Sequence, residues 1–185
     1  MGVRLSGARY EEIKRLVVNM FVEYGISCVP INAFEIAFRM GITIIPYSAF
    51  PASTQLLLLK KSSDGFSIQL DTGEWRIYYN DGIRNFGRVN NTIMHEIGHI
   101  VLDHSEESEL AEAEVRFFAK YALVPPPLVH KLGLTSYVQI MTAFEVSIEA
   151  AQNALNYFNK WLAYGGDYFS DYEIALLEQF DFESA

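Results

Sequence analysis

Residues 88–104 decide how the rest of the chain is interpreted, and they spell Arg-Val-Asn-Asn-Thr-Ile-Met-His-Glu-Ile-Gly-His-Ile-Val-Leu-Asp-His. The spacing of the apolar residues predicts a helix over about 91–102. His95 and His99 lie four residues apart, so on a helix they share one face about one turn apart and can bind the same zinc ion. Glu96 lies roughly 100° round the helix from His95, where it can meet a water molecule beside that ion.

A third zinc ligand must come from outside this pattern, because a catalytic zinc ion usually has three protein ligands and leaves its fourth position to water. The nearby candidates are His104, His130, Glu112 and Glu114. His104 faces away if the helix continues, and it lies beyond the helix end if it does not. Both glutamates lie on the next predicted helix, residues 107–124, which can fold back antiparallel. Two residues on a helix are about 200° apart, so one glutamate at most can face the metal, and periodicity does not choose between them.

The remaining elements predict an α+β fold, with helices on either side of a small, mainly antiparallel sheet. Apolar periodicity and capping residues indicate further helices at 10–24, 33–40, 136–144, 147–162 and 168–180. Short apolar runs indicate strands at 42–45, 55–59, 66–70 and 75–79. Tight turns separate the last three strands, so an antiparallel meander is expected there. Strand 75–79, just before the zinc helix, could hold an extended peptide substrate by pairing with it.

Composition narrows the class of partner. The 185 residues include 14 Lys and Arg against 23 Asp and Glu, a formal net charge of −9. Phosphate contacts need clustered cations, so direct nucleic-acid binding is not expected. The longest aliphatic run, residues 56–59, is too short to cross a membrane, and the single cysteine, Cys28, suits a reducing compartment. We therefore expect a cytoplasmic protein without membrane contact, whose oligomeric state the sequence does not indicate.

These stretches resemble a known family, the ImmA/IrrE-like metallopeptidases. Residues 88–104 are similar to the family's zinc helix, and residues 112–125 resemble its downstream glutamate-bearing helix. Residues 30–45 and the Tyr79-Asn80 pair also look like family elements, so the resemblance covers about residues 8–130. It implies a zincin-like catalytic domain over 1–130, with the HExxH helix packed on the glutamate-bearing helix. Residues 131–185 would then be a helical C-terminal segment packed on that domain.

The resemblance also implies roles for single residues. It makes Glu112 the third Zn²⁺ ligand beside His95 and His99, makes Glu96 the general base, and suggests that Tyr79 and Asn80 contact substrate. One departure concerns residue 116. The family often has Asn or Asp four residues after the ligand, whereas this chain has Arg116. A cation near zinc is unfavourable unless it turns outward or pairs with Glu112 or Asp103.

A developing oxyanion would need a donor in addition to the metal. The sequence offers several candidates without choosing among them: Tyr78, Tyr79, Arg88, His104 and His130.

By this resemblance the protein would be a zinc-dependent endopeptidase whose partner is a protein substrate, commonly a helix-turn-helix repressor of a mobile element or stress response. One alternative is a zinc-binding regulatory or interaction module that does not cleave. The intact Glu96 argues against it, since a pure binding site needs the ligands alone. Another alternative is a structural or partner-binding domain in which the two histidines are incidental.

Overall fold

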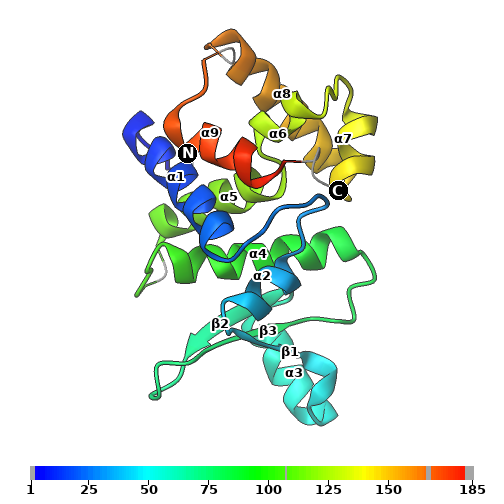
Figure 1. Ribbon diagram of the computed structural model, residues 1–185. Coiled ribbons are helices and arrows are strands. Elements are labelled where there is room, and N and C mark those ends of the chain that lie inside the picture. The colour runs from blue at the N-terminus through cyan, green and yellow to red at the C-terminus, as the bar shows by residue number, and fades with distance from the viewer. Residues whose placement is uncertain (1–2, 107, 166–167, 182–185) are drawn as a thin grey trace.

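Figure 1 shows the computed structural model, which describes residues 3–106, 108–165 and 168–181. A small sheet with α2 and α3 forms one end, the remaining helices form the other, and α4 runs between them (Figure 1). This arrangement confirms the predicted α+β class. The helices are α1 (Gly7–Glu23), α2 (Ala33–Arg39), α3 (Ala52–Lys61), α4 (Phe86–Val101), α5 (Glu109–Leu123), α6 (Pro126–Lys131), α7 (Tyr137–Phe144), α8 (Ile148–Ala163) and α9 (Asp171–Gln179), with a short 3₁₀ helix at Tyr47–Ala49.

The sheet has three strands in the order β1 (Thr43–Pro46), β3 (Trp75–Tyr79) and β2 (Gly65–Gln69). The pairing of β2 with β3 is antiparallel, as predicted, through a turn in which Gly73 takes a positive φ of 85°. The pairing of β1 with β3 is parallel. The predicted meander of three strands is wrong because its first strand, residues 55–59, is helical, which leaves the single β2–β3 hairpin. Because β3 is the central strand and both of its edges are paired, the prediction that strand 75–79 adds a substrate strand is also wrong.

Residues 55–59, predicted as the first strand of that meander, form part of helix α3. A short run of leucines carries no period that separates a buried strand from a helix, and leucine favours helix. Pro51 precedes the first helical residue, where its missing N–H costs nothing. Leu56 and Leu57 are 62% and 64% exposed, so this run does not enter the core.

Helix α4 is fixed on both of its long sides. It packs on α2, β2 and β3 on one side and on α5 on the other. Asn85 caps its first turn by accepting from the Arg88 N–H. The buried Asn90 side chain accepts from the Ala33 N–H at 2.7 Å and donates to the Ile31 carbonyl at 2.9 Å, which ties the start of α2 to α4. The zinc helix predicted from residue 91 therefore begins earlier, at Phe86.

The C-terminal helices pack on the N-terminal one. Helix α9 contacts α1, where the rings of Phe21 and Phe180 meet edge to face. Ser136 caps α7 through a capping box formed with Gln139, and the Ser147 side chain caps α8 by accepting from the Ala150 N–H. The division predicted at residue 130 stays a prediction. No helix in the described ranges has the length and apolar character to cross a bilayer.

Gly98, between the two histidines, lets α4 and α5 cross closely. A Cβ at this position would lie 3.0 Å from Phe118 Cδ1 and 3.4 Å from Val115 Cβ. Replacing Gly98 by valine should therefore lower the free energy of unfolding by about 2 kcal/mol, because the added methyl groups overpack the crossing. Urea unfolding of the metal-free protein measures this change. Gly7→Ala is the control, since no atom lies within 4 Å of a Cβ there. Equal stability of Gly98→Val and wild type would contradict the close crossing.

Candidate metal centre

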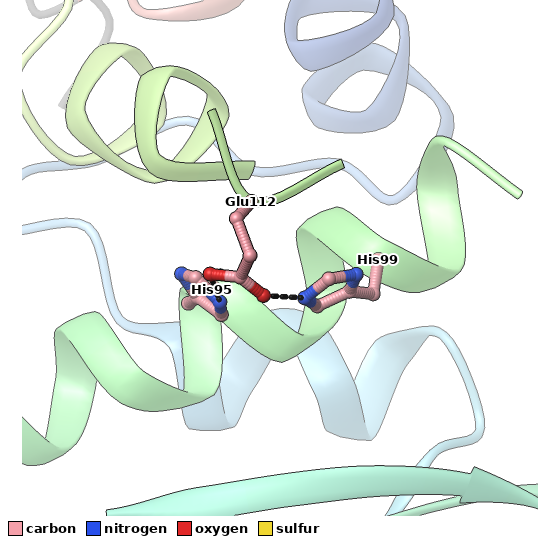
Figure 2. A group of neighbouring side chains, drawn as sticks. All are labelled: His95, His99 and Glu112. Atoms are coloured by element: carbon pink, nitrogen blue, oxygen red, sulfur yellow. Dashed lines mark ion pairs between the residues drawn. The ribbon is translucent and has the colours of Figure 1, made fainter. Parts of the chain in front are cut away.

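His95, His99 and Glu112 form one group. The two histidines project from α4, and Glu112 comes from the first turn of α5, so that its carboxylate lies between the two rings (Figure 2). Its oxygens are 3.6 Å from His95 Nε2 and 3.3 Å from His99 Nε2. One nitrogen or oxygen from each residue lies within 4.8 Å of the others. Within the described residues no other such group of three His, Cys, Asp or Glu side chains is found.

The spacing of these atoms fits a zinc ion. Zinc binds imidazole nitrogen and carboxylate oxygen at about 2.0–2.2 Å in a tetrahedron, whose ligand atoms are then about 3.3–3.6 Å apart. The distance from His95 Nε2 to Glu112 Oε2 and the distance from His99 Nε2 to Glu112 Oε1 both fall in that range. A metal ligand must also be unprotonated. Burial lowers the pKa of His95, with His99 and Arg116 adding to this and Glu112 opposing it, which favours the neutral imidazole.

Glu114 takes a different position from Glu112. Its carboxylate is buried, accepts two hydrogen bonds from Arg9 of α1 and lies 2.9 Å from His104 Nε2. The Arg9 guanidinium lowers the pKa of Glu114, so this carboxylate stays ionised. The structure therefore brings Glu112, and not Glu114, against the two histidines of α4. The assignment of Glu112 as the third ligand stays a prediction that this geometry supports.

His104 does not face away from the histidine pair. Helix α4 ends at Val101, and Asp103 then takes a positive φ of 52°. The chain reverses there and brings His104 Nδ1 to 3.2 Å from His99 Nδ1. The sequence analysis missed this contact and the part played by Arg9. A single left-handed residue after a helix leaves no signal in periodicity.

Glu96 is 8% exposed, and its Oε2 accepts a hydrogen bond of 2.8 Å from the Ser67 hydroxyl. Ser67 lies on β2, so the sheet orients the residue predicted to be the general base. The sequence analysis did not single out Ser67. Its one available signal was a lone hydroxyl between Phe66 and Ile68, on the opposite face of a predicted strand.

The position of the Arg116 side chain explains how this chain tolerates arginine where the family often has Asn or Asp. Its Nε donates to the backbone carbonyl of Glu112 at 2.9 Å, and its side chain is exposed. The guanidinium thus hydrogen-bonds its own helix rather than the Glu112 carboxylate, although it lies near enough to His95 to lower that pKa.

Tyr79 and Asn80 are held by neighbouring parts of the chain. The Tyr79 ring packs edge to face on Phe34, and the Asn80 amide donates to the Ser63 carbonyl and accepts from the Gly82 N–H. These contacts give both residues a structural part, and their predicted contact with substrate stays a prediction.

Three of the candidate oxyanion donors also make contacts with neighbouring residues. Arg88 binds Asp64 through two nitrogens, and Tyr78 stacks on Phe66. His130 lies among three aromatic rings, two on α8 and one in the segment before α9. Their predicted role is untested by these contacts.

An HExxH helix packed on a small sheet, with an antiparallel glutamate-bearing helix on its other side, defines a zincin-like α+β peptidase domain. More particularly, the chain belongs to the family described as the IrrE N-terminal-like domain, peptidase family M78, whose model matches residues 39–156. This is a family of metal-dependent peptidases, the ImmA/IrrE family. The matched range holds the whole sheet, α4 and α5, whereas α1 and α9 lie outside it. Among curated proteins no match is found.

Proposed function

We propose that the protein is a cytoplasmic zinc-dependent endopeptidase that cleaves a regulatory protein, with a helix-turn-helix transcriptional repressor as its substrate. The observation that carries this proposal is the Glu112 carboxylate lying between the His95 and His99 imidazoles, with Glu96 next to His95 on the same helix. The net charge of −9 favours a protein over a nucleic acid as the partner.

His95, His99 and Glu112 would hold the zinc ion, which when bound lowers the pKa of a water molecule and polarises a carbonyl group. Glu96 is the general base in this proposal. Its carboxylate accepts a proton from the attacking water and then gives it to the amine that leaves as the peptide bond breaks. The Ser67 hydroxyl holds Glu96 Oε2 and so keeps this carboxylate in one orientation.

The outer edge of β2 supports an extended peptide as the substrate. The Leu70 N–H bonds the Glu74 carbonyl and the Asn80 N–H bonds the Asp64 carbonyl, which fixes the pairing phase of this hairpin. Phe66 and Ile68 therefore bond β3, while the backbone groups of Ser67 and Gln69 point to the other edge. In the described part of the chain β2 pairs with β3 alone. A substrate strand added at this edge would run beside Ser67, which touches Glu96.

Replacing Gln69 by proline should slow cleavage about fivefold to tenfold. Proline removes an N–H that points to the outer edge and leaves the β2–β3 bonds in place, so one hydrogen bond to the substrate, worth about 1 kcal/mol, is lost. The measurement is kcat/KM on a fixed peptide. Gln69→Ala is the matched control, because it removes the same side chain and keeps the N–H. Equal rates for both variants would contradict binding at this edge.

Cleavage of a protein in a native cell extract tests the proposed function. The zinc-loaded wild type and Glu96→Gln are each added to the extract, and new N-termini are identified by labelling and mass spectrometry. The expected result is a small set of new termini, with a helix-turn-helix repressor among their sources, in the wild-type sample alone. If the protein bound zinc and captured a repressor intact, the non-cleaving module would be the better interpretation.

A further inference from the structure

We propose that Arg9 and Glu114 are positioning residues of the metal centre, which act through His104 to hold His99 in the tautomer that binds metal. Helix α1, which lies outside the matched family range, would thereby contribute to zinc affinity. This inference rests on the metal site of the proposed function, and it concerns residues that neither bind the ion nor touch a substrate.

The four side chains form one continuous chain of polar contacts. Arg9 donates from Nε and Nη2 to the two oxygens of Glu114 at 2.8 and 2.7 Å. Glu114 Oε2 lies 2.9 Å from His104 Nε2. His104 Nδ1 lies 3.2 Å from His99 Nδ1, and the other nitrogen of His99 faces Glu112 at 3.3 Å. These polar contacts thus lead from α1 through α5 and the turn after α4 to His99, a candidate metal ligand.

The ionised carboxylate of Glu114 determines which atom donates in each hydrogen bond from Glu114 through His104 to His99. An ionised carboxylate accepts and does not donate, so His104 Nε2 carries the hydrogen that Glu114 receives. In a neutral imidazole the other nitrogen is then an acceptor, so His99 Nδ1 must donate to His104 Nδ1. In neutral His99 the Nε2 lone pair then lies on the side of Glu112, where a metal ion would stand between the two groups, and this is the state a metal ligand requires.

Burial protects these hydrogen bonds from competition with water. The side chains of Glu114 and His104 are only 8% and 12% exposed, so water does not readily replace either partner. Histidine ligands commonly donate their second nitrogen to an oriented acceptor, and loss of such a partner typically costs 10-fold to 100-fold in metal affinity. Here the acceptor is a second histidine, whose own orientation depends on an ion pair between α1 and α5.

The rival interpretation is that the Arg9–Glu114 pair merely fastens α1 to α5, and zinc affinity separates the two. By competition with a chromophoric chelator, Arg9→Ala and His104→Ala should each bind zinc about 10-fold to 100-fold more weakly than wild type. Combining them should cost little more than the larger single effect, since both interrupt one chain. Tyr10→Leu is the matched control, because the Tyr10 ring packs on Phe117 across the same α1–α5 contact. It should lower the melting temperature and leave zinc affinity unchanged.

Equal losses of zinc affinity in Tyr10→Leu and Arg9→Ala, or wild-type affinity in His104→Ala, would overturn the proposal. A second measurement needs no metal. In long-range ¹⁵N–¹H spectra of the metal-free protein, His99 should carry its hydrogen on Nδ1 and His104 on Nε2. A neutral His99 that carries its hydrogen on Nε2 would overturn the proposal. These spectra can support the positioning chain even if the wild type takes up no zinc, a result that would instead refute the proposed function.

Discussion

Replacing Glu112 by alanine is expected to abolish stable zinc binding, while the protein keeps its fold. The Glu112 carboxylate lies against both imidazoles, at 3.6 and 3.3 Å. A four-ligand structural zinc site binds with roughly 12 kcal/mol, so one ligand accounts for about 3 kcal/mol. Its loss then weakens binding about 100-fold to 1,000-fold. Elemental analysis after dialysis against a chelator should find about one zinc ion per chain in the wild type and very little in this variant.

Two neighbours on α5 serve as controls for Glu112→Ala. Glu109 lies in the same first turn of the helix, and Glu109→Ala should keep its zinc because Glu109 does not belong to the three-residue group. Glu114→Ala leaves all three ligands in place and should show the smaller loss expected of a positioning residue. Full zinc content in Glu112→Ala, with none in Glu114→Ala, would make Glu114 the third ligand and refute the interpretation of the geometry.

The choice between these two glutamates shows where sequence reasoning ends. Helical periodicity places His95 and His99 on one face, because that relation lies within a single helix. The rotation of α5 about its axis depends instead on contacts between elements. It is set by the close crossing at Gly98, where Phe118 packs, and by Arg9, which binds Glu114 across 105 positions of sequence. No local pattern contains either contact, so periodicity left the ligand open, and the family resemblance supplied Glu112.

The errors in the predicted sheet have the same cause, because they also concern contacts between residues far apart in the sequence. The β2–β3 hairpin was predictable because its turn and both strands lie within 15 residues, from Gly65 to Tyr79. The parallel partner of β3 is β1, which follows α2 and is separated from β3 by α3 and β2. In the predicted meander residues 55–59 would lie beside β2, and β1 had no predicted partner. Strand 75–79 was therefore left with one open edge, whereas in the structure the outer edges of the sheet belong to β1 and β2.

Glu96→Gln should retain zinc and lose about 100-fold to 10,000-fold in kcat/KM for cleavage, the range typical of a missing general base. The substitution is close to isosteric, and the carbonyl oxygen of the new side chain can still accept the hydrogen bond that Ser67 donates to Glu96. A side-chain amide has no proton affinity near neutral pH, so it cannot take the proton of the attacking water. The loss should therefore fall on kcat, with zinc content and melting temperature close to those of the wild type.

Ser67→Ala separates proton transfer from the orientation of the Glu96 carboxylate. It keeps the carboxylate and removes the hydroxyl that holds its Oε2, so kcat should fall by about tenfold, less than in Glu96→Gln. The rates are measured on one substrate, with zinc content determined for every sample. Cleavage by Glu96→Gln at the wild-type rate would refute the general-base assignment. If Ser67→Ala were the slower of the two, the sheet would contribute more to the reaction than an orienting hydrogen bond, and the role of β2 would need another explanation.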